Sequence, residues 1–197
     1  MIFKKSYPKQ ISKDVVIVTD EGEYPIWEKD FEKLYSTLGA GDEIENPNAL
    51  IKLAVLRQIK KSAVKKISAG NITRHALVYR ITREKMFDIY PDKADVELIV
   101  DKLERAGFIN DSAYAVRFLE KACEKQWGEY KLRAAMRERG FKSEDIDRAL
   151  LKVKPDWEKM AREFCQGFEG EEREVLFRKL QSRGFSTAVI TDVLNGD

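Results

Sequence analysis

The side chains best placed to do chemistry in this sequence are cations. Arg57, Lys61 and Lys65 recur every fourth residue, which places all three on one face of a helix. Apolar residues such as Leu56 and Ile67 lie on another face, so the cationic stripe is predicted to stay in solvent. Because like charges one turn apart repel, the stripe favours a site for phosphate or another polyanion. The alternative is a solvated helix face without a ligand.

The surrounding segment is strongly basic. Residues 48–90 hold ten Lys and Arg against two Asp and Glu, a net charge of +8, whereas the whole chain carries only +2. With no base-reading motif, we expect non-specific, salt-dependent contact with phosphates. Tyr79 and Tyr90 could stack on bases but are predicted to be core or boundary residues. The candidate binding residues are Arg57, Lys61, Lys65, Arg74, Arg80, Arg83, Lys85, Lys131, Arg133 and Arg137.

Catalytic and metal-binding patterns are missing from the sequence. His75 is the only histidine, so clusters and catalytic triads that need a histidine partner are not supported. Cys123 and Cys165 show no CxxC spacing, which favours buried thiols over a zinc site or a disulfide framework. The acidic runs at residues 144–147 and 171–174 fall in the first turns of predicted helices, where the helix dipole stabilises carboxylates. We expect a protein that is not an enzyme and needs no cofactor or metal.

Targeting signals are also missing. The N-terminal residues 1–14 lack the apolar run of a signal peptide, and no stretch of 18 apolar residues occurs. The sequence therefore predicts a cytoplasmic protein with no membrane association.

Composition and punctuation predict a mainly α fold. Charged residues make up 36% of the chain, and Gly and Pro are sparse. Residues 14–27 predict a short β-hairpin, weakened in its second strand by Pro25, and a short helix follows over 29–38. Beyond a boundary near residue 47, nine helices are predicted, over 48–68, 72–87, 92–106, 111–125, 128–139, 143–153, 156–167, 171–183 and 186–195.

An internal repeat groups these nine helices into threes. The pattern from Leu132 through Arg139-Gly140-Phe141 to Leu150 recurs 44 residues later, around Arg183-Gly184-Phe185. The glycine is expected to stop one helix, the phenylalanine to pack in the core, and Ser143 or Ser186 to cap the next helix. We predict an elongated array of three tandem three-helix repeats after an N-terminal hairpin and helix. The predicted domains are 1–47, 48–109, 110–154 and 155–197.

The segment 107–115 carries a more distinctive motif than the repeat does. After a helix, the chain reads Gly107, Phe108, Ile109, Asn110 and Asp111, followed by Tyr114 and Ala115. Here Gly107 is expected to end the helix, Phe108 and Ile109 to pack in the core, and Asn110 or Asp111 to cap the next helix.

This element resembles the RecX family, and by motif order the resemblance covers residues 48–195. The sequence departs from the family pattern at Trp127-Gly128-Glu129-Tyr130 and at residues 85–89, where a Gly turn is expected. Residues that match the family motifs and are expected to be structural are Gly107, Phe108, Ile109, Asp111, Tyr114, Gly128, Leu132, Gly140, Phe141, Gly184 and Phe185.

The resemblance implies a regulator of the RecA recombinase that binds in the groove of the RecA filament on single-stranded DNA. It implies that the protein alters ATP hydrolysis and strand exchange by RecA, and it favours inhibition over activation. We expect the protein to be a monomer. One alternative is a winged-helix or helix-turn-helix DNA-binding regulator built on residues 72–110, although its third helix, 92–106, is acidic on balance. Another is a helical-repeat scaffold that binds only an acidic protein partner.

Overall fold

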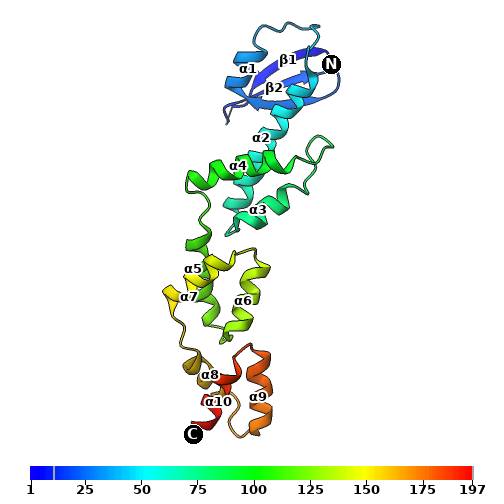
Figure 1. The fold of residues 1–197 in the computed structure, drawn as a ribbon. Helices are drawn as coiled ribbons and strands as arrows, with labels where there is room; N and C mark the ends of the chain where they lie inside the picture. Colours follow the sequence, from blue (N-terminus) through cyan, green and yellow to red (C-terminus); the bar gives the residue numbers. More distant parts are fainter. Residues whose placement is uncertain (11, 197) are drawn as a thin grey trace. The chain divides into compact units, whose positions relative to one another are not determined.

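The computed structural model describes residues 1–10 and 12–196 of the chain. Over those residues the fold is mainly helical, with ten α-helices and one three-stranded antiparallel sheet (Figure 1). This confirms the predicted mainly α fold with an N-terminal β element.

The chain forms two compact units. Unit 1 comprises Met1–Gly70 and Leu77–Phe108. Unit 2 comprises Asn71–Ala76 and the chain from Ile109 onward. The predicted four-part division into domains stays a prediction.

The N-terminal sheet has one strand more than predicted. Its strands β1 (Phe3–Pro8), β2 (Asp14–Thr19) and β3 (Glu23–Trp27) pair in that order. The predicted hairpin is present as β2 and β3, and Pro25 lies within β3 opposite Val16. An edge strand such as β3 tolerates a proline, because one of its edges needs no ladder hydrogen bonds. The prediction of a hairpin alone was wrong, since it missed β1. This edge strand is largely exposed and carries lysines instead of an apolar run, so its sequence gives no clear strand signal.

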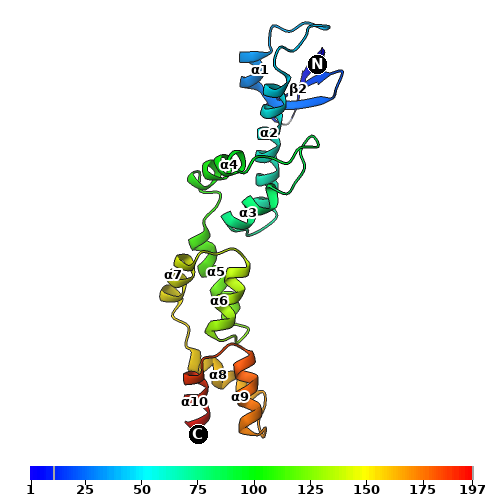
Figure 2. The same cartoon turned by 45° about the vertical axis from the view of Figure 1, so that its right-hand side comes forward.

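Four helices complete the N-terminal half of the chain: α1 (Glu28–Leu34), α2 (Pro47–Ser68), α3 (Arg74–Ile81) and α4 (Lys93–Arg105). The long helix α2 packs its first half against the sheet, where Leu50 and Ala54 join a core with Ile17 and Ile26. Its second half continues beyond the sheet (Figure 2). The side chain of Asn46 caps α2 by accepting a hydrogen bond from the Ala49 N–H at 3.0 Å.

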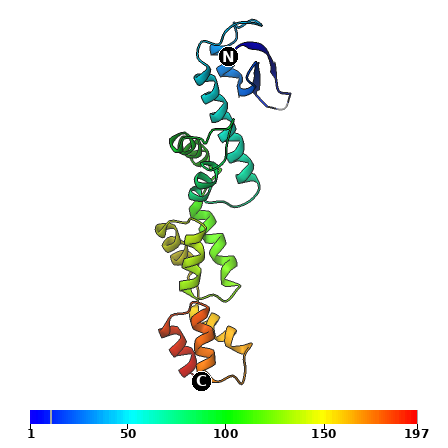
Figure 3. The ribbon, with the colours of Figure 1, turned by 90° about the vertical axis from the view of Figure 1, so that its right-hand side faces the viewer.

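Six further helices form two three-helix groups in unit 2 (Figure 3). They are α5 (Asp111–Cys123), α6 (Glu129–Glu138), α7 (Ser143–Val153), α8 (Trp157–Gln166), α9 (Arg173–Ser182) and α10 (Thr187–Asn195). Each group encloses its own core, around Leu132 and Met136 in the first and Leu180 and Ile190 in the second. Helices α2 to α10 match the nine predicted spans within about two residues at each end, except that α3 ends at Ile81 instead of residue 87. The prediction was wrong there because the chain leaves the helix after Ile81, and Phe87 and Asp88 adopt positive φ.

The two Arg-Gly-Phe turns of unit 2 have the same construction. Gly140 and Gly184 adopt φ of 84° and 85°, and the phenylalanine that follows each is buried. In both turns the arginine guanidinium lies 4.7 Å from the ring centre of a phenylalanine in the first helix of its group. Ser186 caps α10, as predicted. The prediction that Ser143 caps α7 was wrong, because Ser143 is the first residue of that helix and the cap position is Lys142, which makes no side-chain cap bond.

Each of these turns also contacts the start of an earlier helix. The carbonyl of Arg139 accepts a 2.7 Å hydrogen bond from the Thr73 hydroxyl, immediately before α3. The carbonyl of Arg183 accepts one from the Gly128 N–H at 2.9 Å, immediately before α6. A Cβ on Gly128 would lie 2.2 Å from the backbone of Gly184. The packing therefore requires glycine at 128, although its neighbours depart from the family pattern.

Candidate nucleic-acid interface

The first cation of the predicted stripe is part of the fold. Arg57 forms a bidentate ion pair with Asp14 of β2, in which one N–O distance is 2.7 Å. Only 16% of the Arg57 side chain is exposed. Its guanidinium also lies 5.8 Å from the Trp27 ring centre. Burial alone would raise the pKa of Asp14, but hydrogen bonds from Arg57 and Ser12 hold it below its ordinary value. Arg57 thus joins α2 to the sheet.

The next two members of the stripe lie beyond the sheet and are exposed. Lys61 and Lys65 follow Arg57 by one and two helical turns. On the neighbouring face, Ser62 and Lys66 donate hydrogen bonds of 2.7 and 2.8 Å to Glu84. Burial would raise the pKa of Glu84, but these bonds and the nearby lysine charges lower it. Glu84 therefore fixes the chain after α3 beside the C-terminal half of α2.

The chain on both sides of Glu84 adds cations and aromatic rings. Arg80, Arg83 and Lys85 are exposed. Tyr79 and Tyr90 are 52% and 59% exposed, so the prediction that they are core or boundary residues was wrong. Arg83 stacks on Tyr79 at 3.6 Å, and the Lys85 ammonium lies 5.6 Å from the Tyr90 ring centre.

We refer to these exposed side chains as the unit 1 basic surface. It comprises Lys61, Lys65, Tyr79, Arg80, Arg83, Lys85 and Tyr90. Cations interleaved with exposed aromatic rings are suited to a single-stranded nucleic acid, whose phosphates pair with the cations and whose bases stack on the rings.

The predicted cations of unit 2 have different environments. Arg133 donates hydrogen bonds of 2.7 Å to Glu129 and 2.6 Å to Asp147, which raise its pKa and hold the side chain against the protein. Lys131 and Arg137 are exposed, and the Lys131 ammonium lies 5.2 Å from the Trp127 ring centre. Arg74 is partly buried at the start of α3. Of these four, Lys131 and Arg137 are the most accessible to a partner.

Sequence reasoning missed a basic groove on α5. A cavity of about 710 Å³ is lined by Arg117, Lys121, Lys125 and Arg139, together with Tyr114, Phe118, Glu120 and Glu124 among others. Three of its cations repeat the four-residue spacing of the α2 stripe, so the signal was present in the sequence. It was masked by the two interspersed glutamates, which lower the net charge of the segment.

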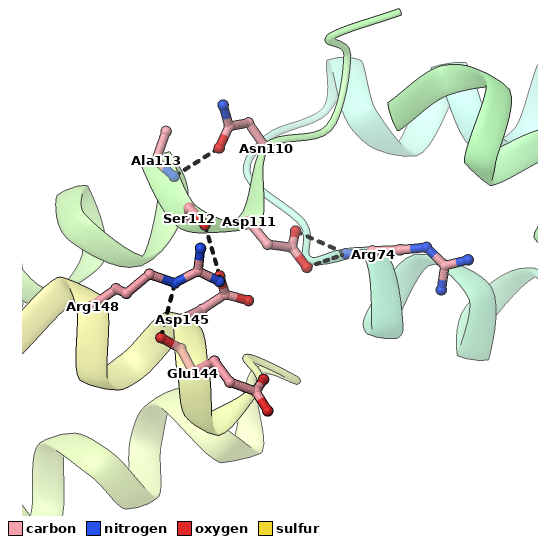
Figure 4. A network of polar contacts seen from close by, with 8 residues as sticks. All are labelled: Arg74, Asn110, Asp111, Ser112, Ala113, Glu144, Asp145 and Arg148. Carbon is pink, nitrogen blue, oxygen red and sulfur yellow. Dashed lines mark hydrogen bonds and ion pairs between the residues drawn. The ribbon is translucent and has the colours of Figure 1, made fainter. Parts of the chain in front are cut away.

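The family-motif residues build a polar network rather than a ligand site (Figure 4). Asn110 caps α5 by accepting a bond from the Ala113 N–H at 2.8 Å. The carboxylate of Asp111 accepts the Arg74 N–H at 3.0 and 3.1 Å, and so caps the start of α3. The Ser112 hydroxyl donates to buried Asp145 at 2.7 Å. The network thus joins the starts of α3, α5 and α7.

The remaining residues of the motif divide between the core and the surface. Tyr114 packs on Phe141 with ring centres 4.8 Å apart, and Ile109 is buried. Phe108 is 64% exposed, so the prediction that it packs in the core was wrong. Gly107, with φ of 80°, turns the chain so that Ile109, rather than Phe108, faces inward.

The described residues offer neither a membrane span nor a metal cluster. None of their helices is long and apolar enough to cross a bilayer. Within the same residues, no group of three or more His, Cys, Asp and Glu side chains could hold a metal ion. Burial raises the pKa of the Cys123 thiol.

Comparison with known proteins identifies the family. Residues 110–150 match the model of the RecX second three-helix domain. The regulatory protein RecX of Pseudomonas fluorescens is 30% identical over 108 residues, which cover 51% of this chain and 70% of that protein. The one from Pseudomonas syringae pathovar tomato is 28% identical over the same shares.

Two solved structures share the fold. A crystal structure of regulatory protein RecX superposes with a TM-score of 0.71 at 20% identity, covering 98% of both chains. The crystal structure of RecX from Lactobacillus salivarius gives 0.62 at 16% identity, covering 72% of this chain and 96% of that one. With the sequence relatives above, these findings show that the chain belongs to the RecX family of regulatory proteins.

Proposed function

We propose that this chain regulates the RecA recombinase in the cytoplasm by binding the RecA filament on single-stranded DNA. In this proposal the protein lies in the filament groove as a monomer and slows ATP hydrolysis and strand exchange. The unit 1 basic surface contacts the DNA backbone without reading sequence. Membership of a family of regulatory proteins supports a binding role, and the proposal involves neither catalysis nor a cofactor.

The observation that carries the proposal is the stacking of Arg83 on the exposed Tyr79, with the exposed Lys85 two residues further along the chain. An exposed tyrosine loses little by staying in water, but it can stack on a base at a gain of roughly 1–3 kcal/mol. The adjacent cations can pair with phosphates and release bound counterions, which makes the affinity fall steeply with salt. Both features suit a flexible single strand better than a duplex, whose bases are already stacked.

The test is the DNA-dependent ATPase rate of RecA, titrated with this protein and with a Lys61→Glu, Lys65→Glu, Arg83→Glu variant at fixed salt. These positions avoid Arg57, whose reversal would break the fold. A matched control reverses the exposed charges of Lys4, Lys33 and Lys152, outside the unit 1 basic surface. We expect the wild type and the control to slow ATP hydrolysis and the variant to lose the effect. No effect of the wild type at stoichiometric excess would overturn the proposal.

The alternatives predict different binding behaviour. A helix-turn-helix regulator would prefer one duplex sequence over others, since its reading helix must contact base edges. A scaffold for an acidic protein would bind its partner without competition from DNA. Comparing oligodeoxythymidine, random duplex and selected duplex by fluorescence anisotropy separates the three, because the proposal requires the single strand to bind best.

A further inference from the structure

A second candidate binding site lies on unit 1 and is lined by none of the residues of the unit 1 basic surface. It is a groove with a cavity of about 590 Å³, within the size range of sites that hold a few side chains or a small ligand. Its lining residues come from the end of β3 and from α1, α2 and α4, with Phe108 following α4.

The floor and walls of the groove are apolar. Ile99 and Leu103 are nearly buried, at 6% and 5% exposure, and form the aliphatic part. Val64 and Phe108 are 43% and 64% exposed and also line the groove. A phenylalanine this exposed loses the free energy that burial of its ring would supply. Covering it with an apolar group recovers part of that energy.

The rim of the groove is positive. Lys29, Lys60 and Lys102 line it and are exposed, whereas Asp30 is the one acidic residue among the lining residues. Trp27 also lines the groove, and its ring centre lies 5.8 Å from the guanidinium of Arg57, which is itself paired with Asp14. The buried ion pair therefore positions one side of the groove before any ligand arrives.

We infer that this groove binds an acidic peptide segment of a protein partner, with one bulky apolar side chain of the segment inserted between Val64 and Phe108. The three lysines complement carboxylates on both sides of that anchor, and the aliphatic floor matches an apolar side chain rather than a flat base. A single strand of nucleic acid fits less well, because Ile99 and Leu103 offer no stacking surface. The inference does not rest on the proposed role in RecA regulation.

The test uses the full chain without DNA or RecA and three fluorescein-labelled hexapeptides in anisotropy titrations. The first carries Phe-Leu flanked by Asp and Glu. The second replaces Phe-Leu with Gly-Gly, and the third replaces the acids with Lys. We expect the first to bind and the other two to bind at least about tenfold more weakly, because each lacks one half of the complementarity.

Two variants locate the binding. Lys60→Glu with Lys102→Glu should weaken the acidic peptide roughly tenfold and strengthen the lysine peptide, an exchange of preference that unfolding cannot produce. Lys5→Glu with Lys33→Glu makes the same charge change outside the groove and should leave the affinity within about twofold. In nitrogen–proton correlation spectra, the Trp27 indole signal should move more than those of Trp127 and Trp157.

Two outcomes would overturn the inference. Equal binding of the acidic peptides with and without Phe-Leu would show simple charge attraction. Oligodeoxythymidine that binds with the same dependence on Lys60 and Lys102 and displaces the peptide would assign the groove to nucleic acid instead. Neither outcome bears on the ATPase test, which alters different residues.

Discussion

The connection between the second and third helices of a repeat is built in two ways in this molecule. In unit 2 it is an Arg-Gly-Phe turn, used twice, in which the arginine covers a phenylalanine and its carbonyl bonds to an earlier helix start. In unit 1 it is the longer segment 82–92, in which Phe87 and Asp88 take positive φ without being glycine. Phe87 packs on Tyr24, with ring centres 5.6 Å apart.

The two kinds of connection place their cations on different rings, which are buried or half-buried at the regular turns and exposed in the irregular connection. Arg139 and Arg183 at the regular turns face aromatic rings of their own repeat. In the irregular connection, Arg83 and Lys85 lie on exposed tyrosines and point their charge to solvent. A copy that departs from the repeat's local rules is where a functional surface is expected.

The largest effect should come from breaking a regular turn. Gly184→Ala is strained at φ of 85°, and its Cβ would lie 2.5 Å from the Lys131 nitrogen. We expect a loss of about 3 kcal/mol in the free energy of unfolding, measured by urea denaturation. The control is Gly107→Ala, where φ is 80° but no atom lies within 4 Å of the new Cβ, so the loss should be about 1 kcal/mol. Equal losses would show that close packing of the turn adds nothing.

The buried cation of α2 should come next. Arg57→Ala leaves Asp14 buried without its ion-pair partner, and we expect unit 1 to lose about 3 kcal/mol of stability. Lys61→Ala, one turn further along the same stripe, should change stability by less than about 0.5 kcal/mol because that side chain is exposed. In a double-mutant cycle with Asp14→Asn, the loss should be strongly non-additive. Additive losses would contradict the role assigned to the pair.

The irregular connection should matter most for DNA. Arg83→Glu with Lys85→Glu removes two cations from the unit 1 basic surface, and we expect the affinity for oligodeoxythymidine to fall at least about tenfold. The plot of the logarithm of the binding constant against the logarithm of the salt concentration should also become less steep. Its slope should change by roughly 0.7 for each phosphate that a cation no longer neutralises. The matched control is Lys142→Glu with Lys152→Glu, which reverses two exposed cations outside the unit 1 basic surface. An unchanged slope in the double variant would remove these residues from the interface.

Local patterns in the sequence predicted most of the helical body. Helix spans and the two regular turns depend on periodicity, caps and a glycine followed by phenylalanine, all of which lie within a few residues of one another. The ion pair of Arg57 could not be predicted in this way, because its partner Asp14 is 43 residues away in the sequence. The exposure of Tyr79 depends likewise on where segment 82–92 runs.

Five of the predicted candidate cations, Lys61, Lys65, Arg80, Arg83 and Lys85, are exposed, whereas Arg57 is paired with Asp14. Whether they bind DNA stays a prediction. The α5 groove carried the same four-residue spacing but was passed over, since net charge by segment cannot show that glutamates and cations share one groove wall.

The smallest effect is expected for Glu84, whose bonds to Ser62 and Lys66 hold the segment 82–92 against α2. The pKa of Glu84 is lowered in the fold, so its bonds to Ser62 and Lys66 stabilise unit 1 above the ordinary glutamate pKa. That stability is lost as the pH falls through the ordinary value of 4.5 toward the lower pKa in the folded state. Because the side chain is 43% exposed, we expect less than about 1 kcal/mol. Urea midpoints measured across this range should fall less in Glu84→Gln than in the wild type, and parallel curves would show that Glu84 is not an anchor.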